Sequence, residues 1–193
     1  MEKGEFKTKE LKFVLIGAGM RGQAYARIAC LDYGCELVAV AEPNDDQRLH
    51  IQQKYGVSEQ NCFISYEQLL KQGEIADFAI IATQDQMHYE IAMMAISCGY
   101  HLLLEKPIAP TPEECVAIWR AAEKKDVQVI VGHVLRYTPF FRAVKELIDA
   151  GKIGRIVSVI HTEGVGNIHQ SHSYVRGNWH NSKQSSNMLL GCI

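Results

Sequence analysis

The chain has 193 residues, of which 47% are hydrophobic and 22% charged, and its formal net charge is −2. This length allows one domain or one and a half, with enough apolar material for a sizeable core. The near balance of charge gives no general attraction to nucleic acid or to an anionic membrane, so we expect neither as a partner.

Short apolar runs alternate with helical patterns through most of the chain. Strands are predicted at residues 11–16, 36–41, 62–64, 76–82, 101–104 and 127–131. Helices are predicted from the glycine-rich turn at 17–22 to about 31, over 44–55, 66–71 and 87–98, from 111 onward, and over 138–150. Repeated alternation of this kind indicates an α/β fold, a doubly wound parallel sheet of Rossmann type with helices on both faces.

The pattern changes after Gly154. Residues 155–162 predict a longer strand that alternates only in part, and residues 163–187 are polar and rich in glycine, serine, asparagine and histidine. We therefore expect two domains, residues 1–135 and 136–193, of which the second is a linker helix and the start of an incomplete α+β domain. The unpaired edge of the strand at 155–162 would favour self-association, and we expect a homo-oligomer.

A glycine motif, Gly17-x-Gly19-x-x-Gly22, follows the first strand and opens a helix. In a dinucleotide site the three glycines permit a tight turn, a close approach to the pyrophosphate and close packing of helix on strand. The intervening Met20 and Arg21 stand at the helix start, where backbone amides face the phosphates. An ordinary glycine-rich turn is the alternative, which the surrounding strand–helix array makes the weaker one.

Glu42 ends the second strand, where an acidic side chain can accept both hydroxyls of the adenosine ribose. Its charge would repel a 2′-phosphate, by up to about 4 kcal/mol for charges ~4 Å apart at an effective dielectric near 20. NAD is therefore the predicted cofactor and NADP the less favoured one, although Arg48 could offset the repulsion. A solvated carboxylate at a strand end is the other interpretation.

Two further groups lie where later strands end, at the carboxyl edge where ligands bind in such sheets. Thr83 and His88 follow the fourth strand and are candidates to line the cofactor cleft, although His88 also fits an ordinary helix start. Glu105-Lys106-Pro107 ends the fifth strand. Lys106 there can donate a hydrogen bond to a substrate hydroxyl and stabilise a developing alkoxide or carbonyl, the alternative being a structural Lys–Glu pair.

These motifs together resemble the Gfo/Idh/MocA oxidoreductases. The resemblance is carried by GAGMRG at 17–22, EKP at 105–107, VGHVLRYTPFFRAVKELIDAGKIG at 131–154 and the segment SYVRGNW at 173–179. It implies a two-domain NAD(P) enzyme about twice as long, whose second domain is an open, mostly antiparallel sheet that holds a sugar or inositol and mediates oligomers. Residues 1–135 would then be the NAD(P)-binding domain.

The resemblance also implies roles for individual residues. Lys106 would be the active-site lysine, and Arg136 would lie near the nicotinamide. The cofactor would be bordered by residues from the glycine motif and from three strand ends: Gly17, Gly19, Gly22, Glu42, Thr83, His88 and Glu105.

The chain departs from the family pattern in two places. Gln84 stands where many members have proline after the threonine. The chain also ends at Ile193, before the histidine–aspartate element that supplies the family's catalytic histidine, and none of the later histidines matches it: His161, His169, His172 and His180. We therefore expect a truncated substrate domain, with cofactor binding but little turnover from this chain alone.

The predicted function is hydride transfer between nicotinamide and a secondary alcohol of a sugar, inositol or related polyol. The alternative is an NAD(H)-binding module without catalysis of its own. A non-redox Rossmann protein such as a methyltransferase is a third reading, which EKP and the RYxP element do not favour. The late histidines at 169, 172 and 180 have no carboxylate nearby, so we expect a polar loop there and no metal.

The sequence also bears on the compartment. The charged first residues lack the apolar stretch of a signal peptide, and no apolar run approaches the ~20 residues of a membrane helix. The six cysteines form no CxxC pair and mostly fall in apolar patterns. We expect reduced thiols and a cytoplasmic protein.

Overall fold

The computed structural model describes residues 10–162, 164, 166–169, 171 and 176. Internal contacts divide the chain into two compact units, residues 1–131 and residues 132–193. The division falls close to the predicted domain boundary, at a turn that follows the last strand of the sheet.

The first unit alternates strands and helices. Its strands are β1 Lys12–Ile16, β2 Glu36–Ala41, β3 Cys62–Phe63, β4 Phe78–Ile81, β5 His101–Leu104 and β6 Val129–Val131. Its α-helices are α1 Met20–Arg27, α2 Asp45–Tyr55, α3 Tyr66–Leu70, α4 His88–Cys98 and α5 Pro112–Lys125. A π-helical turn, Ile28–Asp32, extends α1, and short 3₁₀ turns span Glu59–Asn61 and Asp85–Met87.

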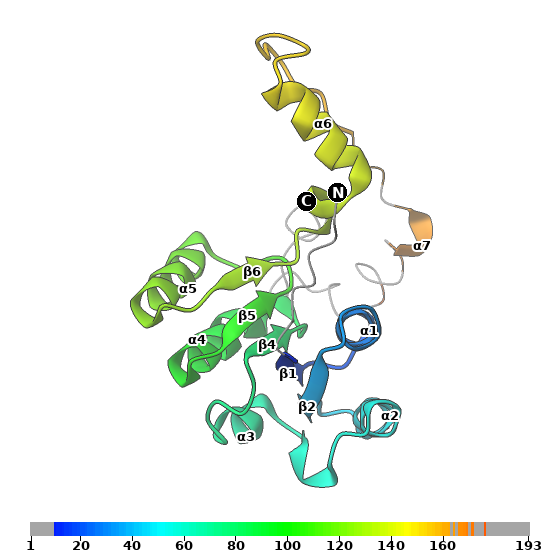
Figure 1. Cartoon of the computed structure of the whole chain (residues 1–193), viewed down its shortest axis with the longest axis vertical. Helices are drawn as coiled ribbons and strands as arrows, with labels where there is room; N and C mark the ends of the chain where they lie inside the picture. Colours follow the sequence, from blue (N-terminus) through cyan, green and yellow to red (C-terminus); the bar gives the residue numbers. More distant parts are fainter. Residues whose placement is uncertain (1–9, 163, 165, 170, 172–175, 177–193) are drawn as a thin grey trace. The chain divides into compact units, whose positions relative to one another are not determined.

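The six strands form one parallel sheet in the order β3-β2-β1-β4-β5-β6. Chain order runs outward from β1 to β3 and then, after a crossover, outward from β4 to β6 (Figure 1). This order reverses between β1 and β4, which makes the fold doubly wound and confirms the predicted fold class.

The two faces of the sheet are buried under different helices. Figure 1 shows α1 and α2 on one side and α3, α4 and α5 on the other. The first side buries alternate strand residues such as Phe13 and Leu15, and Phe13 stacks on Phe78 at 5.3 Å between ring centroids. The second side buries the intervening residues, such as Val14 and Ile16. Burial of successive residues explains the continuous apolar runs of the sequence.

Helix ends follow the local chemistry of the sequence. Thr111 and Glu114 form a reciprocal capping box at the start of α5, with Pro112 in the first turn, as the sequence predicts. Gly56 and Gly99 end α2 and α4 in the left-handed conformation, at φ +69° and +101°. Glycine adopts this conformation without the steric cost that other residues meet.

The second unit contains a 3₁₀ turn, Val134–Tyr137, then α6 Pro139–Asp149 and the short α7 Asn167–His169. The helix predicted at 138–150 is confirmed. The strand predicted at 155–162 is wrong, because those residues have no regular secondary structure. A strand needs a hydrogen-bonded neighbour, and the described part of the chain offers this segment none.

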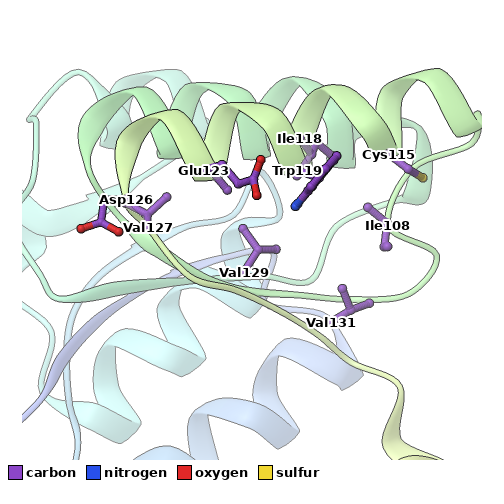
Figure 2. A pocket seen from close by; sticks show the side chains of 10 residues that line it. Ile108, Cys115, Ile118, Trp119, Glu123, Asp126, Val127, Val129 and Val131 are labelled. Carbon is purple, nitrogen blue, oxygen red and sulfur yellow. The ribbon is translucent and has the colours of Figure 1, made fainter.

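A groove of about 440 Å³ lies at the β6 edge of the sheet, beneath α5 (Figure 2). Its lining is mainly apolar, with Trp119 and Ile118 from α5 and Val129 and Val131 from β6. No residue of the predicted cofactor site lines it, so shape alone does not locate that site.

Among the helices of the described residues, none has both the length and the apolar character needed to cross a bilayer.

Candidate functional site

Four strands of the sheet end at the same level. Ile16 of β1 pairs with Ala41 of β2 and with Ile81 of β4, and Ile81 pairs with Leu104 of β5. The hydrogen bonding continues one residue further, with the backbone N–H of Gly17 donating to the Ala41 carbonyl at 2.9 Å. The residues that follow these strands therefore gather at one edge, which is where the sequence places the glycine motif, Glu42, the Thr83 segment and the EKP segment.

The three motif glycines have different surroundings. Gly17 has φ +88°, and a Cβ there would lie 2.6 Å from the carbonyl oxygen of Ala82. A Cβ on Gly22 would lie 2.0 Å from the carbonyl oxygen of Gly17. A Cβ on Gly19 would meet nothing within 4 Å. Two glycines are thus required by the turn itself, whereas Gly19 faces open space.

The open side of Gly19 coincides with the start of α1. Gly19 is the N-cap and, among the residues that the structure describes, supplies no side-chain cap, so the first amides of α1 have no intrahelical acceptor. The first turn of α1 contains no acidic residue. An uncapped helix start with its positive dipole end and an uncrowded backbone suits a diphosphate. The side chains of Met20 and Arg21 are exposed at this place.

Glu42 is buried beside this turn, with 7% of its surface exposed. One carboxylate oxygen accepts the backbone N–H of Ala18 at 2.6 Å, and the other accepts that of Asn44 at 2.9 Å. The side chain therefore fixes the glycine turn against the end of β2. An ionised carboxylate has about four acceptor positions, which leaves capacity for two ribose hydroxyls.

Arg48 on α2 lies behind Glu42. One guanidinium nitrogen donates to the Glu42 carbonyl at 2.6 Å, and another pairs with Asp45 at 2.5 Å. The side chain is largely buried in these contacts. Reaching a 2′-phosphate would require Arg48 to give up both of them, which weakens its capacity to offset the charge of Glu42.

Glu105 is the centre of a small buried network, with 7% of its surface exposed. Its Oε1 accepts the hydroxyl of Tyr25 at 2.5 Å and lies 3.3 Å from Nε of Arg21. Its Oε2 accepts the backbone N–H of Lys106 at 2.9 Å. Burial, then the hydrogen bond to Glu105, raises the pKa of Tyr25. Lys106 itself is partly buried.

Tyr25 is not among the site residues predicted from the sequence. A signal for it exists, because Tyr25 is one helical turn after Arg21 and so lies on the same face of α1. A polar residue on the face of α1 that meets the sheet needs a partner, and the acidic residue at a neighbouring strand end supplies one.

His88 is the first residue of α4 and is almost completely buried, at 1% exposure. Its Nδ1 lies 2.7 Å from the Pro107 carbonyl and its Nε2 lies 3.2 Å from the Thr83 carbonyl. A neutral ring has one N–H, and the shorter contact assigns it to Nδ1, which donates to Pro107. Only the ionised ring donates to both carbonyls. His88 therefore lies buried between the two loops and bonds to the Pro107 carbonyl, instead of projecting into the open edge.

Burial lowers the pKa of His88 below its ordinary 6.5, with contacts to Pro107 and Thr83 and the charges of Asp85 and Glu105 acting in the opposite direction. The unfolded chain consequently binds a proton at His88 more readily than the folded chain does. The stability contributed by neutral His88 is complete above pH 6.5 and is lost as the pH falls through its folded pKa.

This predicts a pH-dependent stability that His88→Asn flattens. Between pH 7 and pH 5, denaturant unfolding followed by circular dichroism will show a steeper loss in the unvaried chain, by at most about 1.4 kcal/mol per pH unit. His50→Asn changes an exposed histidine on α2 and will keep the steep dependence of stability on pH. Parallel profiles for the unvaried chain and His88→Asn would contradict the assignment.

The remaining predicted residues lie elsewhere. Arg136 belongs to the second unit, where it is exposed in the turn Val134–Tyr137, and its role near the nicotinamide stays a prediction. The histidines at 172 and 180 lie outside the described residues, as does the side chain of His169. Within the described part of the chain, no group of three or more His, Cys, Asp or Glu residues could hold a metal ion.

Comparison with known proteins gives a consistent match to one family. The model of the oxidoreductase family with an NAD-binding Rossmann fold, GFO_IDH_MocA, matches residues 11–133. Levoglucosan dehydrogenase of Pseudarthrobacter phenanthrenivorans is 30% identical over 158 residues, covering 78% of this chain and 40% of that protein. Inositol 2-dehydrogenase of Salmonella typhimurium is 27% identical over 151 residues, covering 77% of this chain and 44% of that protein.

A solved structure shares the fold as well. The WlbA dehydrogenase from Bordetella pertussis, in complex with NADH and UDP-GlcNAcA, matches with a TM-score of 0.69 and 27% identity. The match covers 77% of this chain and 45% of that one. The chain thus spans less than half the length of each of these three relatives.

Proposed function

Because the chain belongs to the Gfo/Idh/MocA oxidoreductase family, we propose that it serves hydride transfer between NAD and a secondary alcohol of a sugar, inositol or related polyol. The family binds NAD, as the glycine motif predicts, so the cofactor is confirmed at the level of the family. The single observation that carries the proposal is the shared sheet edge. The uncapped start of α1, the Glu42 carboxylate and the turn that carries Lys106 all follow strands that end at the same level.

Each of these groups has a distinct task. The first amides of α1 hold the diphosphate, and Gly19 leaves room for it. Glu42 accepts the hydroxyls of the adenosine ribose. Lys106 donates a hydrogen bond to the substrate oxygen and stabilises the negative charge that develops there as the hydroxyl proton passes to a base, a role that the family resemblance gives to the histidine–aspartate element of longer members. The bound NAD supplies the hydride acceptor. Two relatives are named for a sugar derivative and an inositol, which favours an alcohol of this class.

This chain spans less than half the length of its relatives. Substrate binding and turnover are therefore proposed for a protein as long as those relatives. The alternative is a chain that binds NAD(H) without catalysis of its own. Titration with NADH, followed by nicotinamide fluorescence, tests the part common to both proposals. Assay of polyol oxidation by the 193-residue chain and by a version extended downstream separates them. Absence of NADH binding would refute both, and equal turnover in both lengths would refute the need for a longer chain.

NAD preference over NADP is a further part of the proposal, carried by the buried carboxylate of Glu42 and the engaged guanidinium of Arg48. The unvaried chain should bind NADH about tenfold more tightly than NADPH, because even a third of the repulsion estimated above, about 1.4 kcal/mol, corresponds to tenfold. Glu42→Gln removes the charge and brings the ratio of the two dissociation constants close to one.

Glu36→Gln is the matched control for Glu42→Gln. It makes the same change at the opposite end of β2, where the carboxylate is half exposed and pairs with Lys12. This variant should keep the tenfold ratio. A Glu42→Gln chain that still discriminates tenfold against NADPH would place the specificity elsewhere.

We also propose a homo-oligomer in the cytoplasm. The apolar residues of α6 are exposed in the described structure, with Phe140 at 70% and Leu147 at 52%, which favours burial in an assembly. The five described cysteines are free thiols, which suits a reducing compartment. Sedimentation velocity tests the assembly, and a single monomeric species across a hundredfold range of concentration would contradict it.

A further inference from the structure

The turn that carries Lys106 is held from both sides by side chains of two different helices. We propose that Tyr25 of α1 and His88 of α4 are positioning residues for Lys106, acting through Glu105 and Pro107. This inference rests on the proposed function, in which the Lys106 ammonium meets the substrate oxygen. We call the arrangement of Tyr25–Glu105 and His88–Pro107 around Lys106 the lysine clamp.

The first side of the lysine clamp is the buried carboxylate of Glu105. Its two oxygens accept different hydrogen bonds. One accepts the Tyr25 hydroxyl at 2.5 Å, and the other accepts the Lys106 backbone N–H at 2.9 Å. Hydrogen bonds to an ionised acceptor are short and about twice as strong as neutral ones. Tyr25 therefore fixes the carboxylate in the orientation that restrains the peptide before Lys106. The half-exposed Arg21 contributes a longer contact of 3.3 Å.

The second side is the His88 ring. Its Nδ1 donates to the Pro107 carbonyl at 2.7 Å, so the peptide after Pro107, one residue beyond Lys106, is held by the first residue of α4. The ring is buried at 1% exposure, which prevents water from replacing this bond without reorganisation. The same ring lies 3.2 Å from the Thr83 carbonyl, in the loop that follows β4.

A lysine side chain cannot position its own charge well. Its ammonium is carried on a flexible stem of four carbons, so the position of the charge depends on how firmly the backbone of the lysine is held. Reaction geometry tolerates little error, since a displacement of about 1 Å can cost on the order of 10²-fold in rate. Fixing the backbone on both sides of Lys106 narrows the range of positions that the ammonium can reach.

The two elements that supply the side chains of the lysine clamp also border the proposed cofactor site. Tyr25 belongs to α1, whose start is proposed to hold the diphosphate, and His88 follows the loop that contains Thr83. Tyr25 and His88 can position Lys106 without contacting NAD themselves. Loss of either is therefore expected to change the placement of Lys106 more than the affinity for NADH.

The test uses the 193-residue chain in three variants, each with one side chain changed. Tyr25→Phe keeps the ring and removes the hydroxyl, and His88→Leu removes the donor to Pro107. His88→Asn is the conservative variant, since its amide nitrogen can replace Nδ1. Tyr33→Phe and His50→Asn make matching changes at exposed positions and serve as controls.

Two measurements without cofactor decide the proposal. Hydrogen exchange of the Lys106 amide by NMR should accelerate at least tenfold in Tyr25→Phe and His88→Leu, relative to the amide of Leu102 in β5. Labelling of the Lys106 amine by trinitrobenzenesulfonate should rise at least threefold relative to the exposed Lys71. His88→Asn should restore both values to within twofold of the unvaried chain, and the controls should match it.

NADH then separates this inference from the proposed function. The dissociation constant of NADH should change less than threefold in Tyr25→Phe, whereas protection of Lys106 by NADH should fall from at least fivefold to under twofold. If the unvaried chain fails to bind NADH but the cofactor-free measurements shift as stated, the proposed function fails and the lysine clamp stands. If both measurements in Tyr25→Phe stay within twofold, the lysine clamp is refuted. Because phenylalanine fills the same space, Tyr25→Phe decides the question even if His88→Leu does not fold.

Discussion

Replacing Gly22 with alanine is expected to destabilise the first unit by at least about 3 kcal/mol, at the upper end of what overpacking costs. The added methyl carbon would lie 2.0 Å from the carbonyl oxygen of Gly17, and this atom belongs to the backbone, which cannot yield as the end of a flexible side chain would. Relief requires α1 to move away from β1, which breaks the packing of Gly22 and Ala26 on the sheet. Thermal unfolding followed by circular dichroism should show a midpoint lower by roughly 10 °C.

Gly19→Ala is the control for this effect, since it adds the same atom three residues earlier. Gly19 has φ −65° and an unobstructed Cβ direction, so its replacement should cost less than about 1 kcal/mol, mostly from weaker N-capping. Equal midpoints for the two variants would show that α1 does not pack on Gly17 as closely as described.

The fold was predictable from the sequence because its signals are local. The apolar runs of five or six residues, the glycine C-caps and the capping box at Thr111 each depend on residues within one element. Gly17 and Gly22 were predictable because the tight turn of a dinucleotide site and the close packing of its helix on the strand require glycine there. Glu42 was predictable from its distance along the chain to the glycine motif, which the length of one βαβ unit fixes.

Contacts between distant segments were not predictable in the same way. Tyr25 and Glu105 are 80 residues apart, and their hydrogen bond depends on β4 and β5 lying beyond β1 in the sheet. His88 fits a cofactor ligand as well as a buried bridge until the position of the Pro107 carbonyl is known. The segment 155–162 has apolar residues suited to a strand, but a strand also requires a partner, which a local pattern cannot report.

The sharpest test of the cofactor site is the affinity of Gly19→Ala for NADH. Because this variant should fold normally, any loss of binding reports on the space above Gly19 and not on stability. A methyl group there would hold a diphosphate away from the first amides of α1, whose hydrogen bonds depend on close approach. We expect the dissociation constant of NADH, measured by fluorescence titration, to rise at least tenfold, equivalent to about 1.4 kcal/mol. ADP contains the same diphosphate without the nicotinamide and should lose affinity by a similar factor. Unchanged affinity for both ligands in a folded Gly19→Ala chain would mean that the diphosphate is seated elsewhere, since no other group at this edge would sense that single carbon.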